Sequence, residues 1–69
     1  MKRLSAERRR FGWSRAELAR RAGMNAGTVS LIETGRLLPY PSQLAKIAGA
    51  LGISAEGLLD EVSDDGDAG

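Results

Sequence analysis

The apolar residues of this chain recur at the spacing of helix faces. In the segment 41–51 they fall at i, i+3, i+4 and i+7, the positions of Leu44, Ile47, Ala48 and Leu51. Similar stripes predict helices over five segments, at residues 3–11, 15–22, 26–34, 41–51 and 54–62. No segment alternates like a strand, so the pattern predicts an all-α domain. Gly49 interrupts the fourth helix at a cost of roughly 1 kcal/mol relative to Ala, and close packing by another helix would explain it.

Local signals mark the ends of the second and third helices. The segment Ser14-Arg-Ala-Glu17 has the spacing of a capping box, and Trp13 and Leu18 have that of a hydrophobic staple. Asn25 suits the N-cap of the third helix, and Gly23 suits a turn between the two helices. Two short helices joined by a tight turn that contains glycine are typical of helix-turn-helix geometry.

Composition narrows the chemistry. The 69 residues suffice for one domain, expected over residues 1–62, while the polar, acidic segment 63–69 is expected to be a disordered tail. The chain has neither Cys nor His, which removes disulfides, the usual zinc ligands and the commonest general base. We therefore expect no metal, no cofactor and no enzyme activity. No apolar run approaches the ~20 residues of a membrane span, and no apolar signal segment follows the basic start, so a cytosolic protein is expected.

Charge is distributed unevenly along the chain. Residues 1–36 contain nine Lys and Arg against three acidic residues, a net charge of +6, whereas residues 37–69 have a net charge of −5. This asymmetry indicates a polyanionic partner for the first half. The alternative is that these charged side chains simply form solvated faces of the helices, and the charge distribution alone does not decide between the two.

Three stretches carry a recognisable motif: Ser14-Arg-Ala-Glu-Leu-Ala19, Ala22-Gly-Met-Asn25 and Thr28-Val-Ser-Leu-Ile-Glu-Thr-Gly-Arg36. With Pro39, the run Leu44–Ser54 and the run Glu56–Leu59, they closely resemble the Cro/cI-type (XRE-like) helix-turn-helix family of bacterial and phage repressors. The resemblance covers residues 4–62. It implies a compact five-helix bundle of the lambda-repressor-like type, which binds double-stranded DNA with its third helix in the major groove. It also implies a transcriptional regulator, expected to be a repressor, in a bacterial cytosol or a phage-infected host.

The resemblance further implies which residues carry the function. An ion pair between Arg8 and Glu33 would tie the first helix to the motif; the alternative is a solvated Arg8 and a Glu33 that caps backbone N–H groups. Arg15 and Arg36 are expected to bind DNA phosphates, with simple solvation as the alternative for Arg15. The other expected DNA-binding residues lie at the start and on the outward face of the third helix: Asn25, Ala26, Gly27, Thr28, Ser30 and Leu31.

That outward face has no long hydrogen-bond donor. Ala26 and Leu31 could contact thymine methyl groups, and Thr28 or Ser30 could make single hydrogen bonds. Discrimination among operator sequences is therefore expected to be weak. Three apolar residues follow in the adjoining loop, namely Leu37, Leu38 and Tyr40. They support an alternative function, a protein–protein adaptor or antitoxin-like partner with weak DNA specificity. Ordinary packing within the loop is the competing interpretation for Leu37 and Leu38.

Duplex DNA is the expected partner, and members of the resembled family bind symmetric sites as dimers. We expect a weak homodimer, or a dimer that forms on DNA. Its interface would use apolar residues that the core also needs: Ile53, Leu58, Leu59 and Val62. The sequence indicates no small-molecule ligand and no membrane partner.

Overall fold

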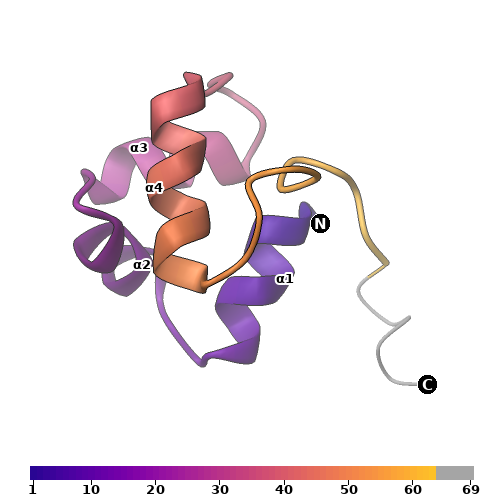
Figure 1. Cartoon of the computed structure of the whole chain (residues 1–69), viewed down its shortest axis with the longest axis horizontal. Coiled ribbons are helices and arrows are strands. Elements are labelled where there is room, and N and C mark those ends of the chain that lie inside the picture. The colour runs from indigo at the N-terminus through magenta and orange to yellow at the C-terminus, as the bar shows by residue number, and fades with distance from the viewer. Residues whose placement is uncertain (64–69) are drawn as a thin grey trace.

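The computed structural model describes residues 1–63, and within them it contains four α-helices and no strand (Figure 1). They are α1 (Arg3–Arg10), α2 (Arg15–Ala22), α3 (Ala26–Glu33) and α4 (Pro41–Leu51). α2 packs against both α3 and α4, and α1 packs against α4. The expected all-helical fold is therefore confirmed. Among residues 1–63, no helix combines the length and the apolar character that crossing a bilayer requires.

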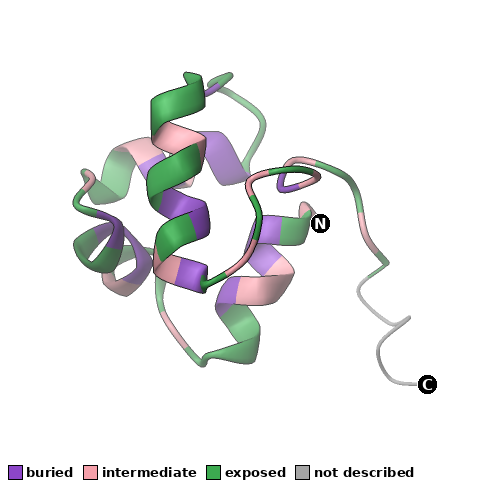
Figure 2. Ribbon diagram, viewed as in Figure 1, coloured by how far each residue is buried: buried purple, intermediate pink, exposed green. Residues whose placement is uncertain are grey.

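The core forms where the inward faces of the helices meet (Figure 2). Its largest fully buried side chains come from all four helices and from the segment after α4: Leu4, Leu18, Val29, Ile32, Ile47 and Leu58. Phe11, just beyond α1, lies outside this core, and its ring stacks on Trp13 with the centroids 4.3 Å apart. The guanidinium of Arg21 covers the same indole ring.

The expectation of a fifth helix is wrong, because residues 54–62 form a series of turns. Gly57 adopts φ +80°, a left-handed conformation that interrupts any helix. Carbonyl groups of the same segment accept bonds from the start of α1: Arg3 N–H donates to Asp60 at 2.8 Å, and Leu4 N–H donates to Leu58 at 3.0 Å. The N-cap of α1, Lys2, offers no side-chain acceptor, so the C-terminal segment caps the helix instead.

This pairing continues outward from α1. Lys2 and Glu61 form an isolated antiparallel bridge, and Val62 N–H donates to the Met1 carbonyl at 2.8 Å. The segment therefore contributes Leu58 to the core and its backbone to α1. The expected disordered tail at 63–69 lies, apart from Ser63, outside the described residues.

α4 has a clear cap at each end, and open space lies beside Gly49 in its interior. The Tyr40 N–H donates to Gln43 Oε1 at 2.8 Å at its start, and Gly52 ends it with φ +71°. A Cβ at Gly49 would meet no heavy atom of a neighbouring element within 4 Å. The expectation that another helix packs closely there is wrong.

Candidate nucleic-acid interface

The connection between α2 and α3 is short and closed by two caps. Gly23 ends α2 in the left-handed conformation, at φ +69°, and Met24 N–H donates to the Ala19 carbonyl at 2.8 Å. Asn25 Oδ1 then accepts from Gly27 N–H at 2.7 Å and starts α3. A Cβ at Gly27 would lie 3.0 Å from that oxygen, so glycine here keeps the cap intact. The tight turn leaves the outward face of α3 uncovered.

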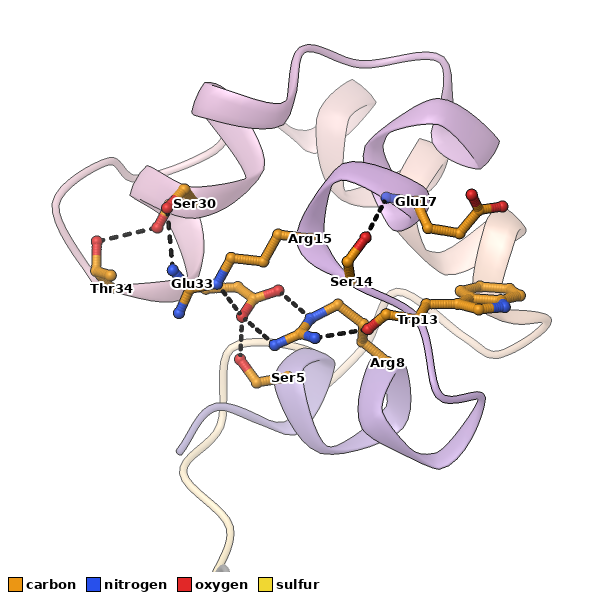
Figure 3. Close-up of polar contacts among 9 residues, drawn as sticks. All are labelled: Ser5, Arg8, Trp13, Ser14, Arg15, Glu17, Ser30, Glu33 and Thr34. Atoms are coloured by element: carbon orange, nitrogen blue, oxygen red, sulfur yellow. Dashed lines mark hydrogen bonds and ion pairs between the residues drawn. The ribbon is translucent and has the colours of Figure 1, made fainter.

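Four hydrogen bonds converge on the Glu33 carboxylate at the end of α3 (Figure 3). Arg8 binds both oxygens, with Nε 2.8 Å from Oε2 and Nη2 3.1 Å from Oε1. Ser5 Oγ donates to Oε1 at 2.9 Å, and Arg15 Nε donates to it at 3.0 Å. Arg8 Nη1 also donates to the Trp13 carbonyl at 2.7 Å. The carboxylate, only 1% exposed, thereby joins α1, α2 and α3.

The structure brings Arg8 and Glu33 together as the resemblance implies, and it buries Arg8 rather than leaving it in solvent. Ser5 and Arg15 are members of the network that the sequence reasoning missed. Ser5 could have been found from its i, i+3 spacing to Arg8 on α1. Nothing local connects Arg15 with Glu33, because the contact exists only once α2 has packed against α3.

Opposing effects act on the pKa of Glu33. Burial would raise it, but hydrogen bonds from Arg8, Ser5 and Arg15, with the positive charge of Arg8, outweigh burial and hold the pKa below its ordinary value of 4.5. Glu33 is therefore ionised at neutral pH. Its charge fixes the two guanidinium groups that flank it.

Arg15 lies at the first position of α2 with its side chain 42% exposed. Besides the bond to Glu33, its Nη1 donates to Ser30 Oγ at 3.0 Å (Figure 3). Arg15 is thus held by two intramolecular hydrogen bonds, yet its side chain remains partly exposed to solvent. A guanidinium has five N–H donors, and these two bonds leave three of them for a ligand.

Arg36 follows α3 directly. Its backbone N–H donates to the Leu31 carbonyl at 2.9 Å, which folds the chain back over the end of the helix. Its side chain is exposed, and the guanidinium has no hydrogen bond or ion pair within residues 1–63. It is therefore available to an external anion.

The other expected contact residues sit at or near the surface of α3. Asn25, Ala26, Gly27 and Leu31 are exposed, whereas Thr28 and Ser30 are partly buried. Asn25 uses one acceptor site of its side-chain oxygen as a helix cap, and its amide NH₂ is left as a donor for a ligand.

The three carboxylates of the first 36 residues are each shared by two arginines. Glu7 pairs with Arg3 and Arg10, and Glu17 pairs with Arg20 and Arg21, in the manner of Glu33. Each such cluster retains one positive charge. The net charge of +6 is therefore spread over the surface rather than cancelled.

A family model and a solved structure are similar to this chain. Residues 2–62 match the family model described as "Helix-turn-helix domain". A search of curated proteins found no match. The crystal structure of the hypothetical transcription factor NHTF from Neisseria is similar, with 38% sequence identity and a TM-score of 0.76 over 80% of this chain. This chain spans only 62% of that one. The family match covers nearly the whole described chain, and the chain belongs to the helix-turn-helix domain family, as its XRE-like motif predicts.

Proposed function

We propose that this chain binds double-stranded DNA, with α3 in the major groove and with Arg15 and Arg36 on the flanking phosphates. One observation carries the proposal: two guanidinium groups with free donors flank the uncovered face of α3. Phosphate contacts supply most of the affinity in such complexes and fix the register of the protein. The N-terminus of α2 adds backbone N–H groups beside Arg15.

The same geometry supports a regulatory role. A domain seated on a duplex excludes other proteins from it, so we assign the chain to transcriptional regulation by repression, in a bacterium or a phage-infected cell. The match to a hypothetical transcription factor supports this assignment.

We further propose that a weak dimer forms, or that two copies associate on DNA. The residues expected at a dimer interface are mostly engaged elsewhere, because Leu58 is fully buried and Ile53 and Leu59 pack on the core. Association through these residues alone would therefore be weak. Sedimentation velocity at two concentrations, with and without duplex, tests this.

The binding proposal is tested by the salt dependence of affinity. Fluorescence anisotropy with a labelled duplex of about 20 base pairs is measured between about 50 and 200 mM salt. Replacing Arg36 by Ala is expected to reduce the magnitude of the log–log salt slope by about 0.9, the value for one lost phosphate contact. Lys46→Ala, which removes the same charge from the exposed face of α4, is the control and is expected to leave the slope unchanged. Equal slopes for the two variants would contradict the assignment of Arg36.

A second candidate function is a protein adaptor. It is favoured by large apolar side chains beside α3, with Leu38 83% exposed and Tyr40 73% exposed. The two functions differ at low salt, where a DNA-binding domain keeps its electrostatic affinity for any duplex. Absence of duplex binding at about 50 mM salt would leave the adaptor as the better description.

A further inference from the structure

The hydroxyl of Ser30 accepts a hydrogen bond while its own proton is left for an external acceptor. A serine hydroxyl offers one donor and two acceptor sites. Arg15 Nη1 donates to Ser30 Oγ at 3.0 Å, and Arg15 is itself held by Glu33 at 3.0 Å. Within residues 1–63, Ser30 Oγ donates no hydrogen bond. By contrast, Thr34 Oγ1 donates to the Ser30 and Leu31 carbonyls.

Leu31 is the next residue along α3, and it is 44% exposed. The residues on either side of this pair, Val29 and Ile32, are fully buried in the core. Ser30 and Leu31 therefore share the outward side of α3. They present a hydrogen-bond donor beside an apolar side chain, and Gly27, one turn before Leu31, adds no side chain that would keep a base away.

Among the bases, thymine alone offers the major groove an acceptor, O4, beside a methyl group, C5-methyl. Cytosine offers a donor at the equivalent position, and guanine offers two acceptors and no methyl group. We propose that Ser30 and Leu31 read a T·A pair, with Ser30 donating to O4 and Leu31 packing on the methyl group. Arg15 is a positioning residue for this contact, because its bond to Oγ occupies an acceptor site and directs the proton outward. The inference rests on the proposed DNA binding.

Modified bases separate the two contacts. The full chain first selects duplexes from a random library, and each thymine of the enriched sequence is then replaced in turn. Deoxyuridine keeps O4 and removes the methyl group, whereas 5-methylcytosine, paired with guanine, keeps the methyl group and puts a donor in place of O4. At one thymine, affinity is expected to fall about fourfold with deoxyuridine, from one lost apolar group. It is expected to fall about two- to twelvefold with 5-methylcytosine, from one lost hydrogen bond.

Protein variants assign each loss to a residue. In Leu31→Ala the difference between thymine and deoxyuridine is expected to disappear. In Ser30→Ala, and in Arg15→Gln to a lesser degree, the difference between thymine and 5-methylcytosine is expected to shrink. Ser42→Ala, an exposed serine on α4, is the matched control and should retain both differences.

The outcomes separate failure of this inference from failure of the proposed function. Enrichment of a sequence in which no thymine shows both the deoxyuridine and the 5-methylcytosine losses would overturn the inference. Uniform weakening of all duplexes by Ser30→Ala would also overturn it, because that result indicates a phosphate contact. Salt-dependent duplex binding with no enrichment at all would also overturn it while leaving the proposed function standing. Absence of any duplex binding at low salt would overturn both.

Discussion

Replacing Glu33 by Gln tests whether its carboxylate holds the domain together. The carboxylate accepts four bonds, three of them from guanidinium groups, and its side chain is 1% exposed. Glutamine offers one acceptor oxygen, loses the negative charge and turns an NH₂ donor toward Arg8. Removing one partner of a buried pair leaves the other charge uncompensated, at a cost of about 3–5 kcal/mol. The contribution of Arg15 is discounted because that side chain is partly exposed, so we expect a loss of about 3 kcal/mol.

That loss is large for a domain of this size. At about 0.05–0.15 kcal/mol per residue, the whole chain is stable by about 3–10 kcal/mol. A loss of about 3 kcal/mol corresponds to a decrease in Tm of about 12–24 °C. Urea denaturation followed by circular dichroism measures it, and fluorescence of Trp13, the single tryptophan of the chain, gives a second probe next to Arg8.

Glu17→Gln is the matched control. Glu17 also binds two arginines, Arg20 and Arg21, but its side chain is 29% exposed, against 1% for Glu33. Ion pairs at the surface contribute little to stability, so this variant is expected to remain close to the parent chain. If Glu33→Gln is no less stable than Glu17→Gln, the reasoning about the buried network is refuted.

The same network fixes the acid sensitivity of the fold. Because the pKa of Glu33 in the folded state lies below its ordinary value of 4.5, its stabilising contribution is fully present above that pH. It is lost as the pH falls through the folded-state pKa. The free energy of unfolding should therefore decrease below about pH 4.5, and this dependence should be weaker in Glu33→Gln, as urea midpoints across pH would show.

Three further substitutions test local structure, each measured by urea denaturation. Gly49→Ala should stabilise the domain by about 0.5–1 kcal/mol, since its site in α4 is helical and open; a loss of stability would mean that the site is crowded. Gly23→Ala should destabilise it by about 1 kcal/mol, because φ +69° is strained for any residue with a Cβ, and an unchanged midpoint would contradict that conformation. Ser14→Ala should cost about 1 kcal/mol through the lost N-cap of α2, whereas Ser42→Ala should cost little.

Helices α1 to α4 were predictable because their signals are local. Ser14 and Asn25 cap the helices that they were expected to start, and Gly23 and Gly52 end helices in the left-handed conformation. The segment 54–62 carries similar local signals, including a Ser54 side chain that accepts from Glu56 N–H. It nevertheless forms turns, because its carbonyl groups pair with the start of α1, more than fifty residues earlier. Local pattern cannot predict such long-range competition for backbone groups.

The candidate site also has one part that the local motif predicts and another that depends on long-range packing. Position in the motif assigned Arg15 to a phosphate, and the folded chain adds two intramolecular partners, Glu33 and Ser30. Because three N–H groups of Arg15 remain free, a phosphate can bind without displacing either partner. The carboxylate that joins α1 to α3 therefore also orients Arg15, which we assign to a DNA phosphate, and through Arg15 the Ser30 hydroxyl. If the proposed contacts are correct, a substitution at Glu33 is expected to change stability and DNA recognition together, whereas one at Ser30 is expected to change recognition alone.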